Sequence, residues 1–181
     1  MQRRFLALAV TLVAASAMMT VSAQGPTNPA SDAVRAGWNA AKANILASAK
    51  TMPDSKYSFK PVDTVRTYGA ILAHVAGANY EFCAGAKGER APYAEDHFEK
   101  NATAAAEIVK ALQDSMAYCD AIYAELTDAN AGEGRTVFGG KRSRIAALMS
   151  NTNHHTEHYG NLVTYLRING LVPPSSQPSK Q

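Results

Sequence analysis

Residues 98–126 of the chain read FEKNATAAAEIVKALQDSMAYCDAIYAEL, and this stretch decides the fold class. Its core-forming side chains recur at alternating steps of four and three residues, which is the spacing of a helix-bundle core. These positions are Phe98, Ala102, Ala105, Val109, Leu112, Met116, Cys119, Tyr123 and Leu126. The pattern predicts one long amphipathic helix over 98–126.

Three other segments share this helical periodicity. One helix is expected to begin at Ser31, a good N-terminal capping residue, and to end before Pro53. Two more are expected over roughly 63–87 and roughly 141–169. Four long amphipathic helices in one small domain predict an all-α fold, a four-helix bundle.

The connections fit this architecture. The polar, glycine-rich segment 128–140 is long enough to cross one end of a bundle, so we expect a long crossover connection there. Gly170 suits the C-terminal cap of the last helix, and Pro173 prevents its continuation. No long segment alternates strictly between apolar and polar residues, so strands are not expected.

The N-terminus has the pattern of a secretory signal peptide. Arg3 and Arg4 precede an apolar run over 5–21, and Ala23 completes a small-residue cleavage site. We therefore predict a signal peptide over 1–23 and a periplasmic or secreted product without a stable membrane anchor.

The remaining chain is expected to form one domain over 24–174, followed by a loose C-terminal tail over 175–181. Its charge is nearly balanced, with 18 basic and 15 acidic residues in the whole chain. No cluster of basic residues interleaves with aromatic ones, so nucleic acid is not an expected partner. A small molecule is the expected substrate or ligand, and a homodimer is possible.

A pair of histidines stands out in the last predicted helix. His154 and His158 are four residues apart, so they project from one face of a helix about one turn apart and could take adjacent positions on one metal ion. Asn161 and Tyr165 continue the same stripe. A polar stripe that faces a core needs partners, because each unpaired buried polar group costs roughly 1–3 kcal/mol.

His74 lies in the middle of the second predicted helix, in the apolar run Ile71–Ala76. With His154 and His158 it makes a set of three neutral nitrogens, which is the ligand set of many catalytic zinc sites with an open position for water. Zinc, nickel and iron all suit such a set. Two simpler interpretations stay open: an exposed polar strip on the last helix, and a core histidine bonded to a carbonyl on the second.

Other histidine patterns are weaker. Residues 154–158 satisfy the formula H-x-x-E-H of inverted zincin proteases, but that family takes a third ligand, a glutamate, from far downstream, and none of the 23 residues after His158 is acidic. Glu157 could still handle protons near a metal. His155 projects about 100° away from His154, and His97 is a possible alternative ligand but more typical of a surface residue.

Two segments resemble the DinB-like family. Residues 154–170 read HHTEHYGNLVTYLRING and are followed by Val172-Pro173-Pro174, which is similar to the family's last helix. The segment from Tyr57 to His74 is similar to the family's second helix, with its single ligand histidine. The resemblance covers the whole predicted domain.

This resemblance implies a four-helix bundle with a long crossover and a metal ion held by His74, His154 and His158. Characterised relatives are similar to metal-dependent transferases or isomerases that use a small thiol. Export departs from that pattern, because small thiols are scarce outside the cytoplasm. Cys83 and Cys119 could form a disulfide in an oxidising compartment or remain two buried thiols.

Three functional hypotheses follow. The first is a metal-dependent enzyme, a transferase or hydrolase, with Tyr165, Asn161 and Glu157 as candidate catalytic residues. The second is a metal- or ligand-binding protein without turnover. The third is a structural dimeric bundle whose histidines bind nothing.

Overall fold

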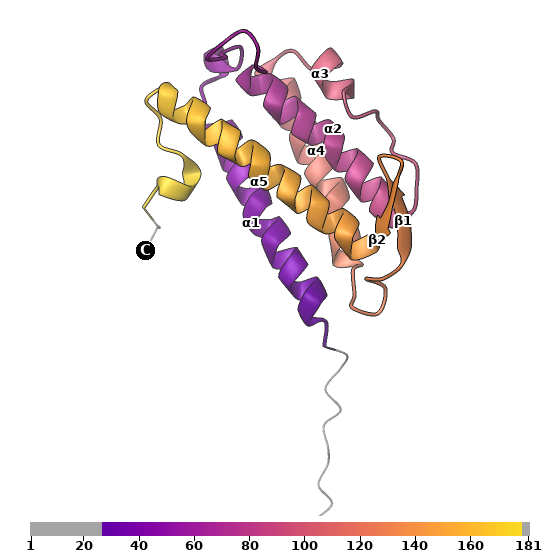
Figure 1. Ribbon diagram of the computed structural model, residues 1–181. Coiled ribbons are helices and arrows are strands. Elements are labelled where there is room, and N and C mark those ends of the chain that lie inside the picture. Colours follow the sequence, from indigo (N-terminus) through magenta and orange to yellow (C-terminus); the bar gives the residue numbers. More distant parts are fainter. Residues whose placement is uncertain (1–26, 179–181) are drawn as a thin grey trace, which may run out of the picture.

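The protein is described by a computed structural model over residues 27–178. Four long helices form the predicted four-helix bundle (Figure 1): α1 (Pro29–Thr51), α2 (Tyr68–Lys87), α4 (Ala105–Ala124) and α5 (Arg144–Ile168). The predicted signal peptide and the last three residues of the tail lie outside the described residues.

Shorter elements lie in the connections. They are the 3₁₀ turns η1 (Asp54–Lys56) and η2 (Pro174–Ser176), the short helix α3 (His97–Asn101), and the strands β1 (Gly134–Val137) and β2 (Gly140–Ser143). None of the helices in the described range is both long and apolar enough to span a membrane.

The predicted single helix over 98–126 is wrong at its beginning. The chain leaves helical geometry after α3 and restarts at α4, because the backbone at Ala104 is extended. The carboxylate of Glu107 accepts hydrogen bonds from the backbone N–H groups of Thr103 and Ala104, both at 3.1 Å. These bonds cap a new helix, which the apolar spacing alone does not reveal.

The connection between α4 and α5 also differs from the prediction, because it contains an antiparallel hairpin of β1 and β2. Phe138 and Gly139 form its two-residue turn, and both have positive φ, 49° and 73°. Two positive φ values are typical of the tight turns that join hairpin strands. The prediction missed the hairpin because its strands are only four residues long.

Helix boundaries depend on local capping. Thr67 and Ser143 cap α2 and α5 by accepting a backbone N–H with their hydroxyls. Gly170 has a φ of 73° and ends α5 as expected. Ser31 does not cap α1; its hydroxyl donates to Asp128 at 2.7 Å, and the helix begins two residues earlier.

Helix α2 lies at the centre of the bundle, and 17 of its 20 residues are buried. It packs against both α4 and α5. A disulfide between Cys83 and Cys119 ties it to α4, and both cysteines are fully buried. The structure therefore settles the open question of the two cysteines in favour of a disulfide.

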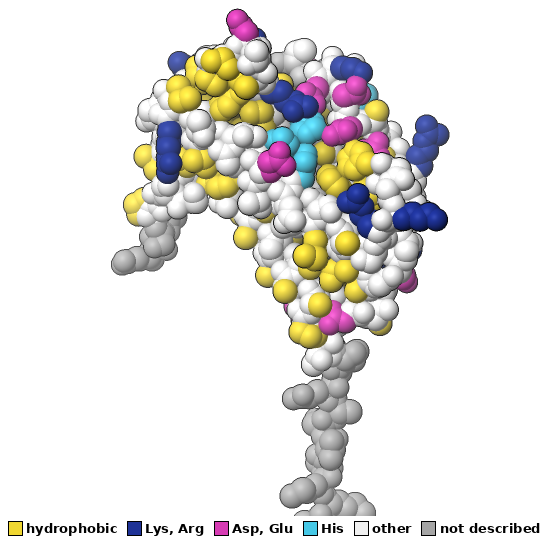
Figure 2. Space-filling view, in the orientation of Figure 1, with side chains coloured by type: hydrophobic (Ala, Val, Ile, Leu, Met, Phe, Trp, Pro, Cys, Tyr) yellow, Lys and Arg dark blue, Asp and Glu magenta, His cyan; other side chains and the backbone are white. Residues whose placement is uncertain are grey.

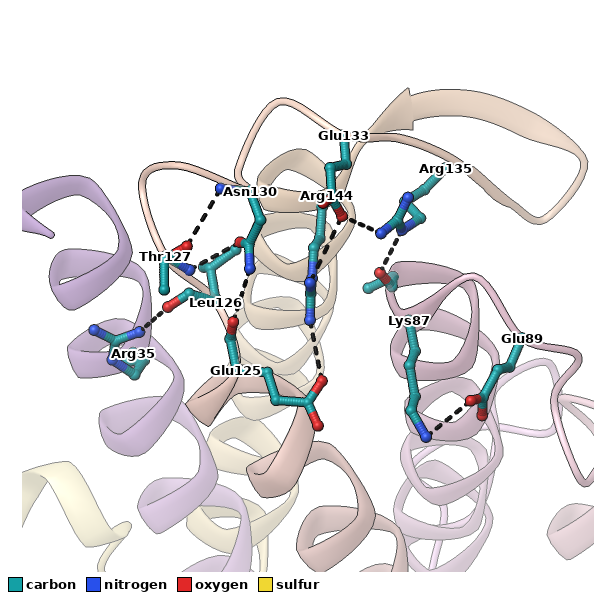
Figure 3. Close-up of polar contacts among 11 residues, drawn as sticks. Arg35, Lys87, Glu89, Glu125, Leu126, Thr127, Asn130, Glu133, Arg135 and Arg144 are labelled. Carbon is teal, nitrogen blue, oxygen red and sulfur yellow. Dashed lines mark hydrogen bonds and ion pairs between the residues drawn. The ribbon is translucent and has the colours of Figure 1, made fainter.

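Ionic contacts hold the hairpin end of the bundle together (Figure 3). Arg144, at the start of α5, reaches Glu125 at 3.3 Å and Glu133 at 3.7 Å. Arg135 pairs with Glu133 and donates from Nε to the carbonyl of Ala86 at 2.9 Å. Arg135 thus attaches the hairpin to α2, and Glu133, the residue before β1, pairs with the first residue of α5.

Candidate metal centre

Helices α2 and α5 lie side by side and bring three histidines together. His154 and His158 are one turn apart on α5, and their Nε2 atoms are 3.0 Å apart. The Nε2 of His74, on α2, lies 3.1 Å from that of His154. Each ring offers one nitrogen, and the three nitrogens lie within 4.8 Å of one another, so the group could hold a metal ion.

Hydrogen bonds alone do not satisfy these nitrogens. Nδ1 of His74 lies 3.0 Å from a carboxylate oxygen of Glu99. If Nδ1 donates there, Nε2 of the same neutral ring carries a lone pair and no proton. No placement of protons then gives all three Nε2 atoms a good partner. A proton on His154 must be shared by two rings, and a proton on His158 leaves the lone pairs of His74 and His154 facing each other. A cation satisfies three lone pairs at once, and zinc at about 2.0–2.1 Å in tetrahedral geometry sets ligand nitrogens roughly 3.3 Å apart, close to the spacing found.

The environment keeps the α5 pair neutral. The pKa of His154 is lowered to about 3, chiefly by burial and then by the neighbouring His158 and His74. Burial and then His74 lower the pKa of His158 to about 4. Because a metal binds the neutral imidazole, both rings are ready for coordination at neutral pH.

A carboxylate behind His74 orients that ring. Glu99, on α3, accepts from Nδ1 of His74 with one oxygen and from Nε of Arg66 with the other, at 2.9 Å. Glu95 lies 3.7 Å from the same Nδ1. A carboxylate on the far nitrogen of a histidine ligand fixes its tautomer and orientation. Figure 2 shows acidic and basic side chains beside histidine on this open face.

Glu99 was not predicted from the sequence, because only the tertiary placement of α3 brings it to the site. Gly77 on α2 makes this placement possible. A Cβ at Gly77 would lie 1.8 Å from the carbonyl oxygen of Glu95. Only glycine lets the segment before α3 lie directly on the helix, and this contact was not predicted.

A cleft of about 500 Å³ opens beside His158. Tyr165 and Asn161, which continue the polar stripe of α5, line it. The hydroxyl of Tyr165 donates to the backbone carbonyl of Arg66 at 2.7 Å. The amide nitrogen of Asn161 lies 3.4 Å from Nδ1 of His158. Glu157 is exposed, and its charge raises the pKa of His158 against the larger effect of burial.

The two remaining histidines lie elsewhere. His155 points away from the three converging nitrogens, but into the core: it is fully buried, and its Nε2 lies 2.7 Å from Oδ1 of Asn79. Its ring also packs against Trp38, with centroids 4.9 Å apart. His97 is half-buried and packs against Tyr93. Neither belongs to the group that could hold a metal among the described residues.

The fold and this site define a class: a four-helix bundle with a three-histidine group that could bind a metal. The sequence matches the model of the DinB superfamily over residues 38–162, which is more than half of the chain. The protein therefore belongs to the DinB superfamily, and the resemblance seen in the sequence is confirmed. No curated protein matches the chain.

Solved structures agree with this assignment. A DinB-like protein from Bacillus cereus ATCC 10987 superposes with a TM-score of 0.63 at 19% identity, covering 79% of this chain and 95% of its own. YfiT from Bacillus subtilis, described as a probable metal-dependent hydrolase with an unusual four-helix bundle topology, gives 0.62 at 18% identity, covering 82% of this chain and 92% of its own.

A mycothiol-dependent maleylpyruvate isomerase is also similar, with a TM-score of 0.62 at 12% identity. The match covers 73% of this chain but only 60% of the isomerase. At these levels of identity the three structures show a shared fold.

Proposed function

We propose that this protein is a metal-dependent enzyme whose single divalent ion is held by His74, His154 and His158. The convergence of three Nε2 atoms beside an open cleft carries the proposal. The ion, when bound, would supply a Lewis acid with a position open to substrate, and zinc, nickel and iron all suit the ligand set.

The chain's own residues would prepare the site. Glu99 holds the ring of His74 by its far nitrogen and so directs Nε2 at the other two rings. Tyr165 holds the loop that carries Arg66, because its hydroxyl bonds to the backbone there. Asn161 lies in the cleft beside His158 and is the candidate for contact with substrate, and Glu157 stays a candidate for handling protons nearby.

Hydrolysis, or group transfer or isomerisation with a small thiol, is the class of reaction that we propose. Similar folds support it, since one belongs to a probable metal-dependent hydrolase and another to a mycothiol-dependent isomerase. We also propose export to the periplasm or medium. The leader pattern supports export, and so does the Cys83–Cys119 disulfide, because such bonds persist in oxidising compartments.

Metal content of purified variants tests the proposal. Elemental analysis after growth in metal-replete medium should find about one ion per chain in the parent and a sharp loss in His74→Ala and His158→Ala, because each variant lacks one of three ligands. Circular dichroism should show the helices intact.

His97→Ala is the matched control and should keep its metal, because His97 lies outside the group. His155→Ala is a poorer control than the sequence suggested, since it would remove a buried ring bonded to Asn79. A metal-free parent, or His74→Ala protein with full metal content, would contradict the proposed site. Metal without turnover of thiol or ester substrates would favour a binding protein.

A further inference from the structure

The cleft beside His158 is lined by two kinds of residue. Pro61, Val65 and Ile71 are apolar. Arg66 is the only Lys, Arg, Asp or Glu among the described residues that line the cleft. A volume of about 500 Å³ lies within the range of small-molecule sites, so one small organic ligand fits.

Arg66 is held in place but has unused donors. Its Nε donates to Glu99, and its backbone carbonyl accepts from Tyr165, so both ends of the residue are fixed. Its side chain is still 47% exposed. Within residues 27–178, no hydrogen bond is formed by its two terminal nitrogens. A guanidinium edge with two parallel N–H groups matches the two oxygens of a carboxylate.

We propose that this cleft binds a small organic carboxylate, with the carboxylate on Arg66, the carbon chain against the apolar lining residues and the reactive end at the three histidines. This inference rests on the proposed function, since it names the substrate class of the same site. The cleft offers one cation, with Thr64 and Asn161 as further polar groups. One positive charge suits a singly charged carboxylate better than a phosphate dianion.

Matched pairs of hydroxamates test the proposal with zinc-loaded protein. Succinate, glutarate and adipate monohydroxamates carry a metal-binding group at one end and a carboxylate at the other. Butano-, pentano- and hexanohydroxamate have the same lengths but end in a methyl group. Titration calorimetry should show that for at least one length the carboxylate-terminated member binds about tenfold tighter or more, because a charge-assisted bidentate contact forms.

Arg66→Gln should abolish that preference while leaving the affinity for the alkyl hydroxamates and the zinc content unchanged. Arg66→Lys should keep only part of it, because an ammonium lacks the planar fork. Arg142→Gln is the control. Arg142 lines a separate cleft of about 630 Å³ with Arg135 and Lys141, a second basic place on the described surface where an anion could bind. This variant should behave like the parent.

Equal binding within every pair would overturn the inference while leaving the metal site in place. So would a preference that survives in Arg66→Gln or disappears in Arg142→Gln. Loss of zinc from Arg66→Gln would overturn it too, because Arg66 would then act by holding Glu99 behind His74. A parent that binds neither zinc nor any hydroxamate would overturn the proposed function, and this inference with it.

Discussion

Helices α2 and α5 give the same kind of side chain to the same site, but the fold holds them differently. Helix α2 is buried on nearly all sides, whereas only nine of the 25 residues of α5 are buried. The α5 pair is set by helix geometry alone, one turn apart. His74 depends on a carboxylate from α3 and on a glycine contact. One half of the site is therefore local, and the other half is tertiary.

Lowering the pH should destabilise the folded protein mainly through the histidines of α5, and this is the largest effect that we expect. The pKa values of His154, His155 and His158 are all lowered, in each case chiefly by burial. The folded state keeps these rings neutral, while the unfolded chain protonates them near pH 6.5. Their contribution to stability is complete above that pH and is lost as the pH falls toward 3–4.

For metal-free protein we therefore expect the free energy of unfolding to fall by a few kcal/mol between pH 7 and pH 5, with an upper limit of about 2 kcal/mol per histidine. Urea unfolding at each pH measures this. The variant His154→Gln/His158→Gln should lose most of the slope, because glutamine does not titrate. An identical slope in that variant would show that other groups cause the acid sensitivity.

A pair of glycine substitutions should next distinguish the contribution of α2 to the site from that of α5. Gly77→Ala places a Cβ 1.8 Å from the carbonyl of Glu95, so the segment before α3 must move. We expect a loss of roughly 1–3 kcal/mol or more in unfolding free energy. Metal affinity should also fall, because Glu99 moves away from His74.

Gly160→Ala is the counterpart on α5, where a Cβ would meet nothing within 4 Å. Alanine favours an exposed helix by roughly 0.5–1 kcal/mol over glycine, so this variant should be more stable and keep its metal. Thermal unfolding and metal titration of both proteins give the comparison. If the two variants respond alike, the glycine contact on α2 does not position the site.

The same division explains what sequence could reveal. The apolar periodicity predicted the bundle, and the spacing of His154 and His158 placed them on one face, because both depend only on helix geometry. The helix break before Ala105 depends on a carboxylate cap. The short hairpin depends on a two-residue turn in which Phe138 has a positive φ, which is unusual for a residue other than glycine. Neither leaves a periodic signal.

The residues of the site show more clearly what could not be predicted from the sequence. Sequence placed His74 near the pair only through its apolar setting and the family resemblance. It gave no indication of Glu99 or Arg66, which come from a short helix and a loop that meet α2 only in the folded chain. His155 was expected simply to point away, and the structure adds that it is a core residue bonded to Asn79.

The last prediction isolates the tertiary half of the site with a matched pair of carboxylates. Glu99→Gln keeps the size of the side chain but replaces a charged acceptor behind His74 with a neutral amide. Loss of such a supporting carboxylate commonly weakens metal affinity by about 10- to 100-fold. Glu157→Gln should change the metal affinity little, because Glu157 is exposed on α5 and contacts no ring nitrogen among the described residues. Competition with a chromogenic zinc chelator measures both affinities.

Because the ring orientation of His158 is set by its own helix, the weakening in Glu99→Gln should disappear in a His74→Ala background, where the carboxylate has no ligand left to orient. A tenfold loss that persists without His74 would mean that Glu99 acts on the metal by its charge, and the contrast between the local and the tertiary half of the site would fail.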